Sequence, residues 1–130
     1  MILLDTNIII DYWRSTTKET GQALLRLDSC ICGAVLAELL QGARNEWEVA
    51  WARRAVSKYR WLGTPSKVWH RLGMNLMTLR REGLAVPFPD ALLATVAIEH
   101  NVPLWSRDKH FVKMQQVLPA LQLYKPEAES

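Results

Sequence analysis

Short apolar blocks alternate with longer segments of helical periodicity along the whole chain. Residues 1–4 form a short uninterrupted apolar run, which is typical of a strand buried on both faces of a parallel sheet. We predict strands over residues 1–5, 29–33, 61–64, 102–106 and 122–125. Helical patterns lie between them, over residues 7–13, 19–28, 34–44, 46–60, 65–83 and 90–100, with a short helical turn over 106–111. Strands that alternate with helices predict an α/β fold, here a three-layer α/β/α sandwich around a short parallel sheet of four to five strands.

Several residues mark where the predicted helices begin and end. Asn45 is a good N-cap, Pro65 suits a helix start, and Gly83 suits a left-handed end. Gly42 falls inside the helix predicted over 34–44, where a glycine costs about 1 kcal/mol relative to alanine. Together with Ala34 it leaves the backbone open on either side of Glu38, which suggests that another element or a ligand needs this space.

The length and composition narrow the possible classes of protein. The 130 residues suit one domain, which we place at 1–125, followed by a frayed tail at 126–130. No apolar run approaches the roughly 20 residues of a membrane helix, and the start lacks the pattern of a signal peptide, so we expect a cytoplasmic protein without a membrane partner. A net charge of +3 permits a polyanionic partner without requiring one. Cys30 and Cys32 are expected to be buried core groups on one strand face.

Four acidic residues occupy comparable places in this pattern. Asp5 and Asp108 each follow a predicted strand, Asp90 opens a buried helix, and Glu38 lies one turn into the helix after the second strand. Taken singly, Asp90 and Asp108 are well explained as N-caps, and Glu38 as a solvated helix residue. Asp5 is harder to explain, because an acid in so apolar a segment is expensive to bury without compensation.

The four acids indicate a cation site if they meet at one edge of the sheet. Carboxylates in close pairs repel by about 4 kcal/mol at an effective dielectric near 20, so such a cluster requires a cation. Oxygen ligands completed by water suit Mg²⁺ or Mn²⁺. A metal of this kind polarises a phosphoryl oxygen and activates an attacking water, which points to phosphodiester hydrolysis.

Four segments of the chain resemble, in order and spacing, the acidic motifs of the PIN-domain ribonucleases, and most of all the VapC toxins of toxin–antitoxin pairs. These segments are Leu4-Asp5-Thr6-Asn7, Ala37-Glu38-Leu39-Leu40-Gln41-Gly42, Asp90-Ala91-Leu92-Leu93-Ala94 and Ser106-Arg107-Asp108-Lys109-His110-Phe111. The resemblance implies a Mg²⁺- or Mn²⁺-dependent endoribonuclease with an RNA substrate, a homodimer, and a cognate antitoxin whose tail occupies the site. It assigns catalysis to Asp5, Glu38, Asp90 and Asp108, the metal to Asp5, Asp90 and Asp108, and supporting roles to Thr6, Asn7, Ser106 and Arg107.

The chain also departs from the family pattern, and other functions remain open. Val35 and its neighbours precede Glu38 where a hydroxyl residue is frequent, His110 stands where a further Asp is frequent, and Trp105 replaces a small aliphatic residue. One alternative is a catalytically silent PIN-fold module that binds RNA or a protein, although such a module is expected to have lost at least one of the four acids. A phosphatase with Asp5 as nucleophile is a third, but Asn7 stands where its second acid belongs. The tryptophans at 13, 47 and 51 suit either base stacking or packing.

Overall fold

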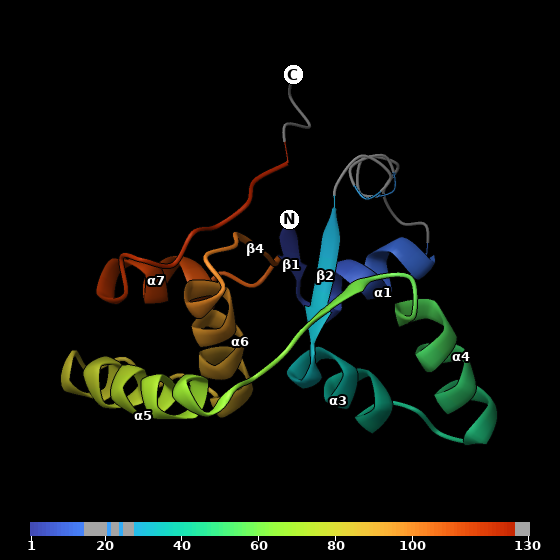
Figure 1. Ribbon diagram of the computed structural model, residues 1–130, viewed down its shortest axis with the longest axis horizontal. Coiled ribbons are helices and arrows are strands. Elements are labelled where there is room, and N and C mark those ends of the chain that lie inside the picture. Colours follow the sequence, from blue (N-terminus) through green and yellow to red (C-terminus); the bar gives the residue numbers. More distant parts are fainter. Residues whose placement is uncertain (15–20, 22–23, 25–27, 127–130) are drawn as a thin grey trace.

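A four-stranded parallel sheet forms the centre of the protein (Figure 1). The computed structural model describes residues 1–14, 21, 24 and 28–126. The strands are β1 (Ile2–Leu4), β2 (Ser29–Cys32), β3 (Arg60–Leu62) and β4 (Leu104–Trp105), in the spatial order β3-β2-β1-β4. Every pair is parallel, so the predicted class of α/β fold and the parallel sheet are confirmed.

Six helices of the described residues surround this sheet. They are α1 (Thr6–Arg14), α3 (Gly33–Gln41), α4 (Glu46–Val56), α5 (Ser66–Arg81), α6 (Phe88–Glu99) and α7 (His110–Val117). In the view of Figure 1, α5, α6 and α7 lie on one side of the strands and α1 and α4 on the other. Helix α5 packs on α6, and α3 packs on α4 and contacts both α1 and α6. The sheet is thus the middle layer of the predicted sandwich. Among the described helices, none combines the length and the apolar character that crossing a membrane would take.

The apolar blocks of the sequence form the core. All of β1 and β2 is buried, including the free thiols of Cys30 and Cys32, as predicted. Helix α6 buries residues 91–97 without interruption, and α5 and α3 pack against it. Trp105 fills the core beside Tyr124, with ring centroids 5.1 Å apart. This explains why a large side chain is accepted where the family often has a small one.

Several predicted boundaries are confirmed and others are wrong. Asn45 caps α4 by accepting a hydrogen bond from the Glu48 N–H at 2.9 Å, and Gly83 has a left-handed φ of 75°. Gly42, however, is the C-cap of α3 rather than an interior residue, because the chain must leave this helix before Asn45 starts the next one. The small residue at position 42 is therefore explained by the end of α3, and it does not require a ligand or another element beside Glu38.

The other corrections concern four further elements. Asp90 is not an N-cap, because Pro87 takes that position, so Asp90 lies in the first turn of α6. Helix α4 ends at Val56 instead of residue 60, and the predicted strand at 122–125 is reduced to a single bridge between Leu104 and Leu123. The helical turn predicted over 106–111 is a longer helix that begins at residue 110. The helix predicted over 19–28 and the frayed tail lie largely outside the described residues.

Candidate active site

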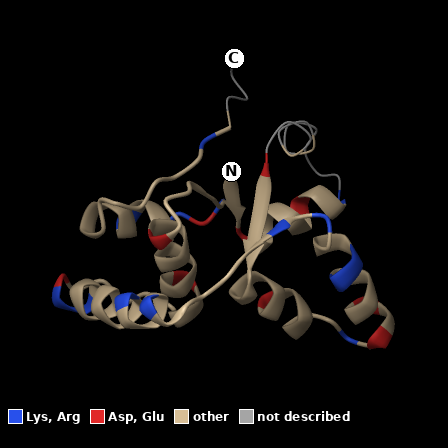
Figure 2. Ribbon diagram, viewed as in Figure 1, with Lys and Arg blue, Asp and Glu red and all other residues tan. Residues whose placement is uncertain are grey.

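The four predicted acids come from four separate elements that meet at the carboxyl ends of β1 and β4. These two strands are neighbours, and the Asp5 N–H donates to the Trp105 carbonyl at 3.0 Å. Asp5 therefore leaves β1 beside the loop that carries Asp108. Figure 2 shows acidic positions on α3 and α6 and a row of lysines and arginines along α5, whereas α4 carries acids at its start and arginines near its end. The topology thus brings four of the 13 acids of the chain to one edge of the sheet.

Asp5 is the most buried of the four carboxylates, with 7% of the residue exposed. Its Oδ1 accepts a hydrogen bond from the Thr6 N–H at 2.7 Å, and its Oδ2 accepts one from the Ser106 hydroxyl at 2.6 Å. Burial raises the pKa of Asp5 above its ordinary value, and the charges of Asp90 and Asp108 raise it further, while both hydrogen bonds act against this shift. The two donors therefore hold the carboxylate in one orientation despite its unfavourable surroundings.

Ser106 and Asn7 connect the end of β1 to the loop after β4. The Ser106 hydroxyl, which donates to Asp5, also accepts a hydrogen bond from the Asp108 N–H at 3.0 Å. The Asn7 amide nitrogen lies 3.3 Å from the Ser106 oxygen, and the Asn7 amide oxygen accepts from the Arg107 N–H at 3.2 Å. The guanidinium of Arg107 forms an ion pair with Asp11. Ser106 and Asn7 thus fix the separation between two of the acids, and Arg107 contributes its backbone to the same network.

Glu38 faces this group from α3. Burial raises the pKa of Glu38, and the charges of Asp5 and Asp90 add to the rise, whereas the Thr6 hydroxyl acts in the opposite direction. The Thr6 Oγ1 atom is nevertheless buried and has no partner within hydrogen-bond geometry in the part of the chain that the structure describes. The Thr6 hydroxyl therefore acts on the Glu38 carboxylate without forming a hydrogen bond of good geometry.

Asp90 and Asp108 share their surroundings with His110, which the sequence prediction did not include among the site residues. One ligand atom from each of these three residues lies within 4.8 Å of the other two. The His110 Nδ1 atom is 3.4 Å from Asp90 Oδ2 and 3.3 Å from Asp108 Oδ1. Burial raises the pKa of Asp90 and the Asp108 charge adds to it, while the contact with His110 lowers it. The position of His110, two residues after Asp108 in a motif that often has a further acid, is the signal that identifies it.

The donor set at this site fits a divalent cation. Asp5 interacts electrostatically with Asp90 and Asp108, and Glu38 with Asp5 and Asp90. Three carboxyl groups with raised pKa values and a fourth beside them supply the hard oxygen ligands that Mg²⁺ and Mn²⁺ prefer. A cation there would relieve the repulsion among the carboxylates.

A groove of about 470 Å³ adjoins the acidic site. Glu38 lines one part of it, and Trp13, Trp47 and Trp51 line the other. The rings of Trp13 and Trp51 meet edge to face at a centroid distance of 4.1 Å, whereas Trp47 is 72% exposed. An apolar surface of this kind, open to solvent and continuous with a carboxylate of the site, is typical of a surface that binds another molecule.

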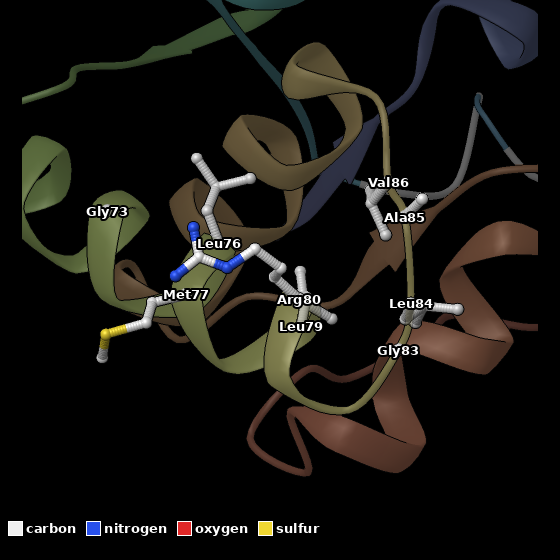
Figure 3. A pocket seen from close by; sticks show the side chains of 9 residues that line it. All are labelled: Gly73, Leu76, Met77, Leu79, Arg80, Gly83, Leu84, Ala85 and Val86. Carbon is white, nitrogen blue, oxygen red and sulfur yellow. The ribbon is translucent and has the colours of Figure 1, made fainter.

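Another cavity, of about 600 Å³, lies between the end of α5 and the segment that follows it (Figure 3). Arg80 is the one charged residue in its lining, which otherwise consists of Gly73, Leu76, Met77, Leu79, Gly83, Leu84, Ala85 and Val86. None of the four acids contributes to it. It therefore lacks the convergent polar groups of a catalytic site.

The fold and the acidic site at the carboxyl ends of two adjacent strands agree with the match to a known family. The chain belongs to the PIN domain family, whose model matches residues 2–117. Among curated protein sequences, none matches it significantly.

Solved structures share this fold over nearly their full length. VapBC2 from Rickettsia felis, crystallised with a DNA fragment from its promoter, is 24% identical, with a TM-score of 0.81 over 95% of this chain and 98% of that one. VapBC-1 from nontypeable Haemophilus influenzae is 24% identical, with a TM-score of 0.80 over 96% and 98%. DNA-bound VapBC from Salmonella typhimurium is 19% identical, with a TM-score of 0.81 over 95% and 96%. These matches establish a common fold.

Proposed function

We propose that this protein is a metal-dependent endoribonuclease, and that it acts as the toxin of a type II toxin–antitoxin pair. The observation that carries the proposal is the meeting of Asp5, Glu38, Asp90 and Asp108, three of which have raised pKa values because burial and neighbouring carboxylates disfavour their charged forms. Membership of the PIN domain family supports the class of activity, and the likeness to VapBC structures supports the role as a toxin. We expect it to act in the cytoplasm as a homodimer.

Asp5, Asp90 and Asp108 are the residues that would hold Mg²⁺ or Mn²⁺. When bound, the cation neutralises the carboxylates, polarises the scissile phosphate and lowers the pKa of the attacking water. The hydroxyl of Ser106 and the N–H of Thr6 keep the Asp5 carboxylate oriented. Because Asp108 N–H bonds to the same Ser106 hydroxyl, Asp5 and Asp108 are held at a fixed separation.

Glu38 is suited to move the proton in this reaction. It lies beside Asp5 and Asp90 without being one of the proposed metal ligands, and burial raises its pKa, which favours a general base. In the proposed step, a water oxygen bonds to phosphorus, Glu38 accepts the proton of that water, and the bond from phosphorus to the leaving ribose oxygen breaks. The leaving oxygen then takes a proton from solvent. The products are a phosphomonoester and a free hydroxyl.

The groove that contains the three tryptophans is the proposed place for the cognate antitoxin. It is mainly apolar, and it includes Glu38, so a segment bound along Trp47 and Trp51 would extend to the catalytic carboxylates. Three similar structures are VapBC complexes, which supports a protein partner of this kind. An occupied groove would restrict access of RNA to the site.

Cleavage of RNA by the purified protein tests the activity. We expect cutting in Mg²⁺ or Mn²⁺, loss of cutting in EDTA, and loss in the variants Asp5→Asn and Asp90→Asn. Glu82→Gln removes an acid from the exposed end of α5 and is the matched control, which should cut as the wild type does. RNA cutting that survives both EDTA and Asp5→Asn would disprove the proposal, and RNA binding without cutting in either metal would favour the silent module.

Expression in cells tests the role as a toxin. Induction of the wild-type chain should arrest growth, and Asp5→Ala should relieve that arrest. A short upstream reading frame for a DNA-binding antitoxin, whose co-expression restores growth, would support the pairing. Growth that continues despite abundant folded wild-type protein would contradict it.

A further inference from the structure

His110 places an imidazole nitrogen among the carboxylate oxygens of the site. Its Nδ1 atom lies 3.4 Å from Asp90 Oδ2 and 3.3 Å from Asp108 Oδ1. Adjacent ligands of an octahedral ion with bonds of about 2.1 Å lie roughly 3.0 Å apart, so these separations are close to those of neighbouring ligand atoms. The ring therefore faces both acids, at distances that suit either an ion pair or neighbouring ligands of one cation.

The backbone holds His110 in this position. The His110 N–H donates to Asp108 Oδ1 at 2.9 Å, which ties the start of α7 to the acid beside it. The next residue, Phe111, is buried in the core and anchors the same turn. The side chain of His110 itself remains 55% exposed, so its second ring nitrogen is free to face water. The backbone thus fixes the position of His110, and its imidazole ring remains accessible to solvent.

We propose that His110 supplies a nitrogen ligand to the cation site, and that this ligand makes the site of this chain select Mn²⁺ and related transition-metal ions over Mg²⁺. The inference rests on the proposed metal-dependent function and specifies which metal that function uses. Imidazole binds first-row transition ions well, whereas Mg²⁺ strongly prefers oxygen ligands and retained water.

Charge acts in the same direction as ligand type. An acid at position 110 would add another negative charge beside Asp90 and Asp108, and it would attract a hard cation mainly by electrostatics. A neutral imidazole at this position adds a donor atom without that charge. The site therefore loses attraction for Mg²⁺ and gains a bond that Mn²⁺ uses more effectively.

Binding of MnCl₂ and MgCl₂ to the metal-stripped full chain tests this inference. Calorimetry gives the ratio of the two affinities, and pulsed electron paramagnetic resonance of bound Mn²⁺ detects a coordinated nitrogen directly. For the wild type we expect a nitrogen signal and a preference for Mn²⁺. In His110→Asp the nitrogen signal should disappear and the preference should fall by about tenfold. His110→Ala should also lose the signal, and His70→Ala, which removes an exposed histidine of α5, should retain both.

The outcomes separate this inference from the proposed function. Mn²⁺ bound to the wild type without a nitrogen signal, or an unchanged Mn²⁺ to Mg²⁺ ratio in His110→Asp, would overturn the role of His110 while leaving a carboxylate metal site intact. If neither Mn²⁺ nor Mg²⁺ binds the folded wild type or any folded variant, the metal site itself is overturned. Circular dichroism of each variant establishes that the chain is folded in these measurements.

Discussion

Replacing Asp90 by Asn should stabilise the metal-free protein, because it removes one of the charges that repel one another at the site. Ligand atoms of Asp90 and Asp108 lie within 4.8 Å of each other, and two unit charges at that separation repel by about 3.5 kcal/mol at an effective dielectric of 20. The side chain of Asp90 is 18% exposed and that of Asp108 is 35% exposed, so solvent and salt reduce this figure, and His110 offsets part of it. We expect a net gain of about 1 kcal/mol in the free energy of unfolding, or roughly 3–4 °C in melting temperature.

Urea unfolding in EDTA measures this gain. A double-mutant cycle with Asp90→Asn and Asp108→Asn isolates the repulsion, since each single change should remove it and the double change should therefore gain less than their sum. The coupling should shrink at high salt, because ions screen the two partly exposed charges. Glu82→Gln controls for the loss of a negative charge elsewhere. A metal-free Asp90→Asn protein that is less stable than the wild type, or a cycle without coupling, would refute the reasoning.

Three further predictions concern stability and reactivity. The pKa values of Asp5 and Asp90 are higher in the folded than in the unfolded protein, so the metal-free protein should lose stability as the pH rises from about 4 through these raised values. The urea midpoint measures this decline, and saturating Mg²⁺ or Mn²⁺ should remove it. Ser106→Ala should lower the free energy of unfolding in urea by about 1.5–3 kcal/mol, because Asp5 and the Asp108 N–H both lose their hydrogen-bond partner. It should also weaken metal binding, and an unchanged unfolding curve would contradict this prediction. Burial raises the pKa of Cys30 to about 11, so a thiol reagent should modify it only in unfolded protein, and rapid labelling of the native chain would show that the strand is accessible.

The sheet and the convergence of the acids follow from patterns that act over short distances. The apolar runs at β1 and β2 form strands buried along their whole length, and parallel strands bring their carboxyl ends to one edge. Asp5 and Asp108 follow two such blocks, which proved to be neighbours in the sheet. The common edge was therefore predictable from the sequence, whereas the adjacency of the two strands is known only from the sheet order.

The elements that sequence reasoning misplaced depend on competition between neighbouring segments. Gly42 and the residues after it are compatible with a longer helix, and only the cap at Asn45 forces the chain out of it. Similarly, Pro87 moves the start of α6 ahead of Asp90. These outcomes depend on which of two adjacent signals prevails, and periodicity alone does not decide that.

The place of His110 at the site could not be predicted from the sequence, for a different reason. A histidine near a strand end is common, and the sequence does not show that its Nδ1 atom lies between two carboxylates. Helix α7 is also short, with only Phe111 and Met114 fully buried, so its apolar pattern is weak. Asp90 and Asp108 are far apart in the sequence, and only the folded structure shows that His110 lies beside both.

Anomalous diffraction from a crystal of the full chain soaked in Mn²⁺ is the most direct test of the cation site. If the four carboxylates form one cation site, an anomalous peak will lie among Asp5, Asp90 and Asp108, and it will be absent from crystals of Asp90→Asn. No peak at that edge of the sheet, with Mn²⁺ bound elsewhere or not at all, would contradict a metal-dependent mechanism for this protein.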